Sequence, residues 1–296
     1  MVSSPQNDEK HRTFDCEPTL GDSEVLGFCR SGFLMLDAVV PESVNRQTCD
    51  YLNLRCPANP CWRPEGLIDA EIERVRRSNE PSPIMLERWF EQHILLNPVA
   101  CGAVRSILGR HVGLPVLMSN HLSKCPRESQ EWHHDADSMF GPQVNYLQVF
   151  YYPQDTPVEM GPTQIISGSH LTEAHGEPDE QVAVSTAAPA GSIFITAYPI
   201  LHRRSHATGR GVRHLLKYNY WRTVPPQRDW IIEADFDFHT ASYGGHTAAH
   251  RVAQMFYWLC GKPDEFRTLG GQSWPYSGSH HNMIGRTYGF PVERVN

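Results

Sequence analysis

The spacing of hydrophobic and polar residues divides the chain into three parts. Over residues 22–112 the apolar residues recur mainly at helical spacing. After Gly113 they form short runs separated by glycine and proline, a pattern typical of antiparallel strands. Beyond Pro225 only residues 247–260 regain an amphipathic helical period. The parts are interpreted as one domain over 22–296. It has a helical N-terminal layer at 22–112, a β core at 113–225 and a C-terminal extension at 226–296.

The same pattern, with its capping and turn residues, predicts the individual elements. We expect helices at 25–31, 41–54, 67–77, 83–95, 99–108 and 247–260. We expect strands at 33–37, 116–123, 144–152, 163–166, 182–185, 192–196 and 214–222, and a loop at 125–130. Residues 1–21 are polar and are expected to be disordered. Consecutive short strands favour a sandwich or barrel, so the predicted fold class is mainly β with flanking helices.

Charge and composition argue against some partners. The chain has a formal net charge of −7, with 40% hydrophobic and 20% charged residues. An acidic surface repels nucleic acid and anionic membranes, so neither is expected as a partner. The N-terminus lacks the apolar core of a secretory signal, and no run reaches the roughly 20 apolar residues that span a bilayer. We therefore expect a cytoplasmic protein whose eight cysteines are reduced.

The densest group of chemically versatile side chains lies in Glu131–Asp137. This stretch could be a metal site, a hydrogen-bonded polar cluster or a solvated loop. Side chains at i and i+2 of an extended chain project from the same face. His133 and Asp135 therefore share a face, whereas His134 has only Ala136 at that spacing. His133 and Asp135 could hold one metal ion, whose third ligand has to come from elsewhere.

A distant histidine and an arginine extend this pattern. His202 lies 67 residues beyond Asp135, shortly after the expected strand at 192–196. Two imidazoles and one carboxylate on one side of an ion form the facial triad of non-haem Fe(II) oxygenases, which leaves positions open for a cosubstrate and for oxygen. Arg213 follows eleven residues later. Its planar, charged fork suits the far carboxylate of a metal-chelating cosubstrate, although an isolated arginine more often forms a surface salt bridge.

Together with other short motifs, these residues indicate a family. The sequence resembles the phytanoyl-CoA dioxygenase-like Fe(II)/2-oxoglutarate oxygenases from about Val25 to Trp221. The motifs that carry the resemblance are Ser31–Leu34, Lys124–Pro126, Trp132–Asp135, Gly161–His170, Gly191–Phe194, His202 and Arg213. The most specific of them is Gly168–Ser169–His170, because it follows the Trp-His-x-Asp motif at the distance found in the family.

The resemblance implies a double-stranded β-helix, or jelly roll, that uses Fe(II), 2-oxoglutarate and O2. It implies that iron is bound by His133, Asp135 and His202, and 2-oxoglutarate by Arg213, Asn120 and Thr163. Two positions depart from the family pattern. Ser167 stands where many relatives have proline, and Arg204 stands where they often have a small residue or serine.

The implied activity is oxidation of a small-molecule metabolite, most simply hydroxylation, with 2-oxoglutarate converted to succinate and CO2. Related halogenases lack the carboxylate ligand, so Asp135 favours an oxidative outcome. Trp132, His134 and Asp137 are candidate substrate contacts, with packing or exposure to solvent as the alternative. Two other functions stay open. One is a catalytically silent jelly-roll binding protein, and the other is an oxygen-independent metal hydrolase or isomerase of the cupin type.

Overall fold

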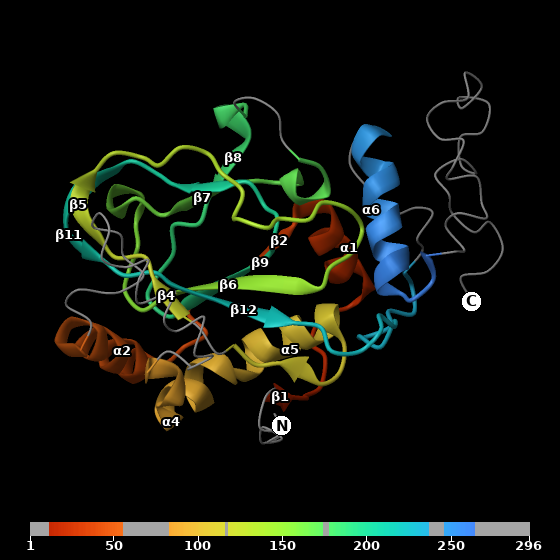
Figure 1. Ribbon diagram of the computed structural model, residues 1–296, viewed down its shortest axis with the longest axis horizontal. Coiled ribbons are helices and arrows are strands. Elements are labelled where there is room, and N and C mark those ends of the chain that lie inside the picture. The colour runs from red at the N-terminus through yellow and green to blue at the C-terminus, as the bar shows by residue number, and fades with distance from the viewer. Residues whose placement is uncertain (1–11, 56–82, 116–117, 174–177, 237–245, 264–296) are drawn as a thin grey trace.

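A seven-stranded antiparallel sheet forms the centre of the computed structural model, which describes residues 12–55, 83–115, 118–173, 178–236 and 246–263 (Figure 1). Its strands are β1 Thr13–Phe14, β2 Phe33–Leu36, β3 Val112–Gly113, β4 Met118–Asn120, β6 Tyr146–Tyr152, β9 Ser192–Ala197 and β12 Leu216–Trp221. They run in the order β1–β3–β12–β6–β9–β2, and β4 also pairs with β12. Strands far apart in the sequence are thus neighbours in the sheet.

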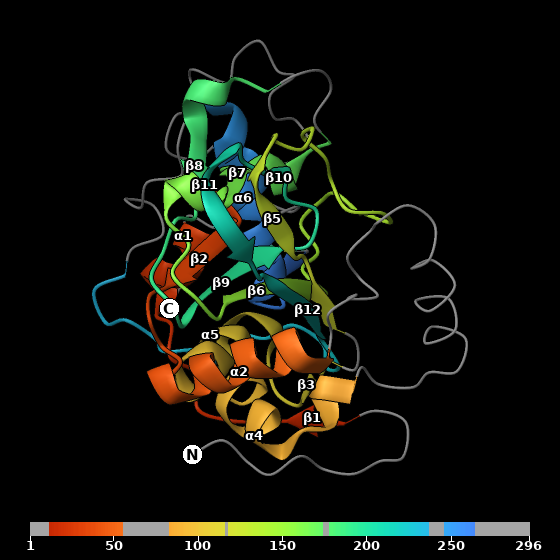
Figure 2. The same cartoon turned by 90° about the vertical axis from the view of Figure 1, so that its left-hand side faces the viewer.

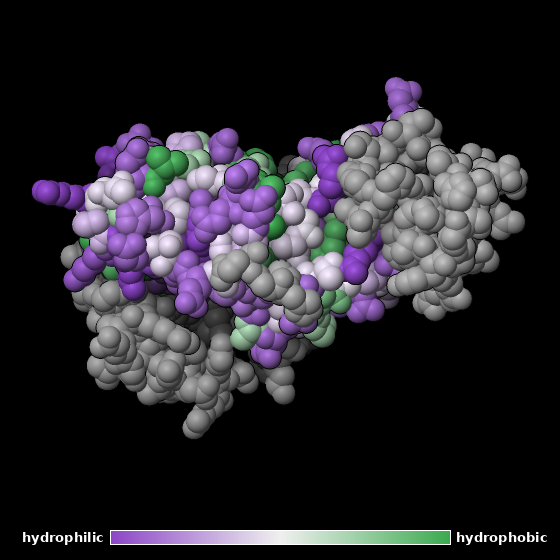
Figure 3. Space-filling view, turned by 90° about the horizontal axis from the view of Figure 1, so that it is seen from above, coloured by the Kyte–Doolittle hydropathy of each residue, from purple (hydrophilic) through white to green (hydrophobic). Residues whose placement is uncertain are grey.

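Two smaller antiparallel sheets lie on one side of the large sheet (Figure 1). Their strands are β5 Ser123–Arg127, β7 Thr163–Ile166, β8 Ala183–Ser185, β10 His202–Arg204 and β11 Ala207–Arg213. One has the order β10–β7–β8, and the other pairs β11 with β5. The surface on this side is mostly hydrophilic (Figure 3). Short strands in facing sheets give a jelly roll, so the predicted fold class is confirmed.

Helices cover the opposite side and one end of the large sheet. Their bounds are α1 Asp22–Ser31, α2 Glu42–Arg55, α4 Arg88–Phe90, α5 Pro98–Leu108 and α6 His246–Leu259. Figure 2 shows α2, α4 and α5 stacked below the sheet, whereas α1 and α6 lie side by side at one end of it in Figure 1. Within the described residues, no helix is long and apolar enough to cross a membrane.

The ends of α5 follow directly from the sequence. The Asn97 side chain accepts hydrogen bonds from the backbone N–H groups of Val99 and Ala100, at 3.1 and 3.2 Å. Pro98 occupies the first turn, where no intrahelical N–H is needed. Gly109 ends the helix with a φ of 79°. The helix expected at 99–108 is therefore confirmed.

Alternation along β6 builds a core on each face of the large sheet. On the helical side, Leu147 and Val149 belong to the same buried cluster as the apolar residues of α5. On the other side, Phe150 stacks on Phe194 with 4.3 Å between the ring centroids. This second, smaller cluster also contains Tyr152 and Leu215. The space between the sheets is thus apolar at one end, and Gln148 lies further along the same inner face.

The N-terminal segment is ordered from residue 12, although the sequence predicts disorder over 1–21; residues 1–11 lie outside the described part. Phe14 is only 2% exposed and packs edge-on against Tyr220 of β12, with 5.8 Å between the centroids. One buried ring therefore fixes a segment whose composition is otherwise polar.

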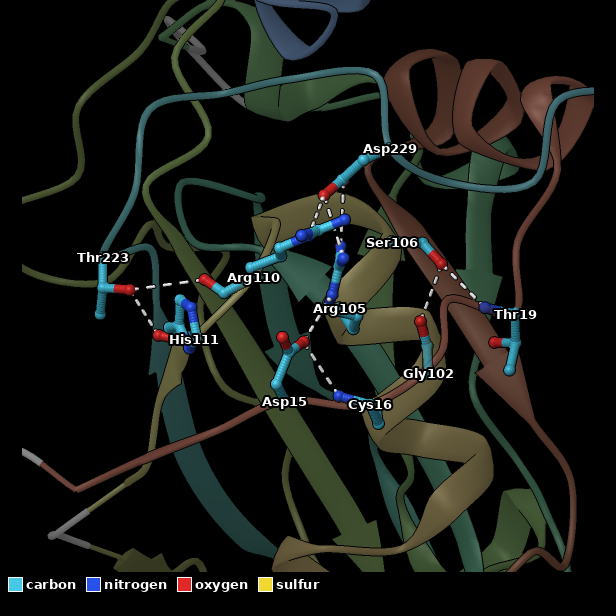
Figure 4. A network of polar contacts seen from close by, with 10 residues as sticks. All are labelled: Asp15, Cys16, Thr19, Gly102, Arg105, Ser106, Arg110, His111, Thr223 and Asp229. Atoms are coloured by element: carbon cyan, nitrogen blue, oxygen red, sulfur yellow. Dashed lines mark hydrogen bonds and ion pairs between the residues drawn. The ribbon is translucent and has the colours of Figure 1, made fainter. Parts of the chain in front are cut away.

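A buried arginine provides the second anchor for this segment (Figure 4). Arg105 of α5 donates to Asp15 at 2.8 Å and, through two nitrogens, to Asp229 at 3.0 Å each. The Ser106 hydroxyl, from the next residue of α5, accepts the backbone N–H of Thr19 at 3.0 Å. One helix thus joins the N-terminal segment to the chain that follows β12.

A buried carboxylate fixes the start of the C-terminal extension. Asp22, which is fully buried, accepts two hydrogen bonds from Arg228 and one from the Trp230 indole, all at 2.8 Å. The backbone N–H of Glu233 adds a fourth at 2.9 Å. Every lone pair that burial removes from water is therefore used.

Some elements differ from the sequence prediction. A loop is expected at 125–130, but β5 extends through Arg127 and pairs with β11. Neither β10 nor β11 is predicted. Glycines and charged residues interrupt the apolar alternation of β11, which leaves most of its side chains exposed. An edge strand of this kind carries almost no hydrophobic signal.

The helix expected at 83–95 is divided rather than continuous. A short 3-10 turn at Pro83–Leu86 precedes α4, and Glu91–Leu95 is π-helical. The helix expected at 67–77 lies outside the described residues.

Replacing Arg105 with alanine should lower the free energy of unfolding by about 3 kcal/mol, because it leaves two carboxylates without the guanidinium between them. Arg110→Ala is a matched control. Arg110 also contacts Asp229, at 3.3 Å, but its side chain is 63% exposed. Its loss should therefore cost less than about 1 kcal/mol. Urea unfolding measures both variants, and equal losses would contradict the anchoring role of Arg105.

Candidate metal centre

Two histidines meet where the chain after β5 crosses the start of β10. His133 and His202 form an isolated antiparallel bridge, with backbone hydrogen bonds of 3.1 and 3.0 Å in the two directions. Their ring centroids lie 4.6 Å apart. Residues opposite each other in such a bridge project from the same face. The pairing of two remote segments therefore brings the imidazoles together.

Asp135 joins these histidines from the same face. Its Oδ1 lies 3.9 Å from Nε2 of His202, and one potential ligand atom from each of the three residues lies within 4.8 Å of the others. The other oxygen, Oδ2, accepts hydrogen bonds from Nε2 of Gln148 and Nζ of Lys217, both at 2.5 Å. One carboxylate oxygen is thus held by the large sheet, and the other faces the histidines.

The backbone fixes the tautomer of both imidazoles. Nδ1 of His133 lies 2.9 Å from the carbonyl oxygen of Glu131, and Nδ1 of His202 lies 3.0 Å from that of Ile200. Because a carbonyl can only accept, each Nδ1 carries the proton. Each Nε2 then presents a lone pair, which is the form in which histidine binds a metal.

Burial and charge keep these groups in their metal-binding protonation states. Burial lowers the pKa of His202 to about 3, and the Lys217 ammonium adds to this effect. For Asp135, burial by itself raises the pKa, but the Lys217 ammonium and the remaining contacts outweigh it and hold the pKa well below its usual range. At neutral pH the site therefore contains a neutral imidazole at His202 and an ionised carboxylate at Asp135.

Arg213 is buried on the same inner face, at the end of β11. Only 1% of it is exposed, and burial lowers the pKa of its guanidinium. It donates to the carbonyl oxygens of Gly161 and His121, but its Nε has no partner. Among the described residues, no carboxylate pairs with it. A buried guanidinium in this state is suited to an anionic ligand.

The cosubstrate contact expected for Asn120 does not fit its position. Asn120 lies opposite Leu216, whose side chain belongs to the core on the helical side of the sheet. Its Nδ2 contacts Nδ1 of His214 at 3.0 Å, and that ring contacts Asn53 of α2 at 3.2 Å. Asn120 therefore faces the helices, and its neighbour His121 faces the interior. Strand parity places Asn120 and His121 on opposite faces, but it does not say which face is inside.

His121 is the interior residue that the sequence analysis missed. Its Nε2 is buried without a partner. Burial, followed by the charges of Lys217 and Arg213, lowers its pKa to about 3. A neutral imidazole thus lies among the charged groups of the site. A lone histidine in a strand carries no signal that distinguishes this role from ordinary packing.

Thr163, the other residue expected to contact the cosubstrate, lies on the inner face. It is 3% exposed and stands two positions before Ile165, which pairs with His202. Its backbone N–H donates to the Tyr152 hydroxyl at 3.0 Å. Gly161, whose carbonyl oxygen receives Arg213, lies two residues earlier.

The three candidate substrate contacts have different surroundings. Trp132 packs against Arg203, whose guanidinium lies 4.5 Å from its ring centroid. Nδ1 of His134 lies 2.8 Å from the carbonyl oxygen of Pro199, and its ring packs edge-on against Phe140. Neither residue lines a described cavity. Asp137 does, in a pocket of about 360 Å³ that it shares with Tyr146 and Tyr198.

The sequence comparison identifies the family. Residues 28–214, more than half of the chain, match the family described as phytanoyl-CoA dioxygenase (PhyH). The chain belongs to the PhyH family. The expected cofactors, Fe(II) and 2-oxoglutarate, agree with this membership and with the His–Asp–His group. No curated protein sequence matches the chain.

Two solved structures of ThoJ support the fold assignment, and HygX is a further similar structure. The apo form of ThoJ, a non-heme monooxygenase, has a TM-score of 0.51 at 18% identity and covers 80% of this chain and 98% of its own. Its nickel complex has a TM-score of 0.50 at 18% identity, with coverages of 82% and 97%. HygX from Streptomyces hygroscopicus, with nickel and 2-oxoglutarate bound, has a TM-score of 0.49 at 13% identity and coverages of 70% and 88%.

The Gly-Ser-His motif of this PhyH protein has a structural explanation. Gly168, with a φ of 80°, donates its N–H to Ser31 at 2.8 Å. The Ser169 hydroxyl accepts the backbone N–H of Leu201, also at 2.8 Å. The motif therefore ties the end of β7 to α1 and supports the backbone immediately before His202.

The histidine of the motif completes this junction. His170 is fully buried, and its Nε2 lies 3.2 Å from the carbonyl oxygen of Cys29. A Cβ on Gly32 would lie 2.3 Å from its Nδ1, and Gly32 has a φ of 79°. The Ser-Gly and Gly-Ser-His motifs are thus two halves of one packed contact.

His170 should make the stability of the protein dependent on pH. Burial lowers its pKa to about 4, below the value of about 6.5 for an exposed histidine. As the pH falls from about 6.5 towards 4, the unfolded chain binds a proton that the folded chain does not, so stability is lost. Between pH 7 and pH 4, the free energy of unfolding of the wild type should fall by up to about 3 kcal/mol more than that of His170→Gln.

The exposed His206 provides the control, because its Nδ1 contacts Glu128 at the surface. His206→Gln should follow the wild-type profile within error. A His170→Gln profile that matches the wild type would show that the buried imidazole is not responsible.

Proposed function

We propose that the chain is a non-haem Fe(II)/2-oxoglutarate-dependent dioxygenase that hydroxylates a small molecule and converts 2-oxoglutarate to succinate and CO2. One observation carries the proposal. A His–Asp–His group of facial-triad composition shares an interior with a buried arginine that has no carboxylate partner among the described residues. Membership of the PhyH family supports the same conclusion.

In this proposal, iron is held by Nε2 of His133, Oδ1 of Asp135 and Nε2 of His202. The carbonyl oxygens that accept from each Nδ1 keep both lone pairs directed at the ion. Gln148 and Lys217 occupy Oδ2 of the carboxylate, which favours a single bond from Asp135 to the metal. A triad bound in this way leaves coordination positions for a cosubstrate and oxygen.

Arg213 takes the distal carboxylate of 2-oxoglutarate, which provides the charge partner that the buried guanidinium lacks. Thr163 and His121 border the same space and can add hydrogen bonds to the cosubstrate. Phe150 and Leu215 form its apolar wall and exclude water from it.

When bound, iron and 2-oxoglutarate supply the oxidising power that removes hydrogen from an unactivated carbon. In this proposal the protein contributes geometry: the triad would fix the metal, Arg213 would orient the cosubstrate, and the cavity lined by Asp137 would present the substrate carbon. Effective positioning of this kind accounts for a large part of catalysis in general.

Anaerobic addition of Fe(II) and 2-oxoglutarate tests the proposal. The wild type should develop the weak visible charge-transfer band of 2-oxoglutarate chelated to Fe(II) and should form succinate once O2 is admitted, and His202→Ala should lose both the band and succinate formation. His206→Ala, which removes an exposed histidine close to the site, should retain both. A wild type without the band would point to a silent binding protein or an oxygen-independent enzyme. Wild-type turnover by His202→Ala would refute the triad.

Arg213→Met should raise the 2-oxoglutarate concentration for half-maximal band formation by roughly 10–100-fold, as expected for the loss of a charge-assisted hydrogen bond. Its affinity for Fe(II) alone should be unchanged, because Arg213 does not contact the triad. Arg204→Met is the control, since Arg204 donates to the carbonyl oxygen of Glu128 instead. An unchanged 2-oxoglutarate requirement in Arg213→Met would contradict the assignment.

A further inference from the structure

The cavity that Asp137 lines lies at the end of the large sheet where β6 begins and β9 ends, and Asp137 follows Asp135 of the His–Asp–His group by two residues. Asn219, which lines it, stands opposite Gln148, whose amide holds Asp135. Asn219 also follows Lys217 by two residues, which corresponds to about 7 Å along a strand. The cavity volume of about 360 Å³ lies within the range of small-molecule sites, roughly 300–1,000 Å³.

The charge of this cavity is carried by one residue. Among its described lining residues, Asp137 is the only one with a carboxylate, and none is lysine or arginine. His170 also lines it, but burial lowers the pKa of that imidazole to about 4, so it is neutral at pH 7. The nearby Lys217 ammonium is bound to Asp135. The cavity therefore favours a neutral or cationic ligand over an anion.

Aromatic side chains reinforce the preference for a cation. Tyr146 and Tyr198 both line the cavity, with 6.4 Å and an angle of 57° between their rings. Tyr146 is 52% exposed, so its ring is available at the mouth. The face of a tyrosine ring attracts a cation by about 0.5–1 kcal/mol at an exposed site. Carbons of Met255 and Val144 complete a partly apolar wall.

Asp137 has an unusual backbone conformation. Its φ is 61°, in the left-handed region that most side chains avoid and that asparagine and aspartate tolerate. Asp137 adopts this conformation because it lies within the tight turn that begins at Asp135. Asp135 of the metal group and the carboxylate in the cavity are therefore placed by one short turn, so the position of a ligand on Asp137 is defined relative to Asp135.

We propose that this cavity binds the substrate through a protonated amine, which Asp137 pairs with and the two tyrosine rings flank. The substrate class is then a small, partly apolar organic amine without acidic groups. This inference rests on the proposed function, because the cavity is taken as the place where the oxidised carbon is presented. Highly anionic substrates such as acyl-CoA thioesters would bring phosphates towards Asp137 and are disfavoured.

The test compares three probes of similar size and different charge. These are phenethylamine, phenethyl alcohol and hydrocinnamate. Their binding is followed by ligand-observed NMR titration on the full chain, first without metal and then with Zn(II) and 2-oxoglutarate, since zinc does not undergo redox chemistry. The wild type should bind the amine about fivefold more tightly than the alcohol, and the carboxylate most weakly.

Asp137→Asn removes the charge and keeps a residue that tolerates the left-handed conformation. It should abolish the preference for the amine and leave binding of the alcohol nearly unchanged. Asp37→Asn is the matched control, because Asp37 is exposed after β2, at the opposite end of the large sheet. That variant should bind all three probes as the wild type does.

The result that overturns the inference is equal or tighter binding of hydrocinnamate by the wild type, or an amine preference that survives in Asp137→Asn. Failure of the proposed function has a different signature. In that case the Fe(II)/2-oxoglutarate band is missing in the wild type, while the titration of the three probes on the metal-free protein still shows whether the cavity prefers the amine. If only the inference fails, the band is present and the amine preference is absent.

Discussion

The site depends on how one carboxylate is held. Oδ2 of Asp135 is bonded by Gln148 of β6 and by Lys217 of β12, which are adjacent strands of the large sheet. Oδ1 faces the two histidines, which pair where β10 joins one of the smaller sheets. The three potential ligands therefore come together only when the sheets pack face to face. The metal group assembles only when the jelly roll closes. A substitution that disturbs either sheet would therefore displace a potential ligand.

The chain from Arg213 through β12 then orders the interior. Arg213, Leu215, Lys217 and Asn219 alternate with residues that face the helical core, and so lie in one row. The row passes from the buried guanidinium of Arg213, over the apolar side chain of Leu215, to Lys217 at the carboxylate of Asp135, and on to Asn219 at the cavity. Because a strand advances by about 3.4 Å per residue, the backbone of β12 sets the spacing between Lys217 and Asn219.

Much of this arrangement can be predicted from the sequence, because it follows from periodicity. Strand parity separates His133 from His134, and the turn residues locate most of the strands. The cosubstrate contact expected for Asn120 rests on the family resemblance alone, and parity gives no correction there, since only the packing of helices on one face decides which side of a strand is inside. Gln148 and Lys217 also escape prediction, because a single polar residue in an apolar strand has the same pattern whether it faces solvent or a metal group.

Several buried polar atoms on the inner face have no partner among the described residues. They are Nε of Arg213, Nε2 of His121, Oε1 of Gln148, Oγ1 of Thr196 and Oδ1 of Asn219. Each such atom costs roughly 1–3 kcal/mol when it is left unsatisfied. A fold selected only for stability would replace them with apolar side chains. Asn120 and Tyr218 leave such atoms on the helical side as well. We expect a bound cosubstrate and substrate to satisfy those beside the His–Asp–His group, which would link the stability of the protein to their binding.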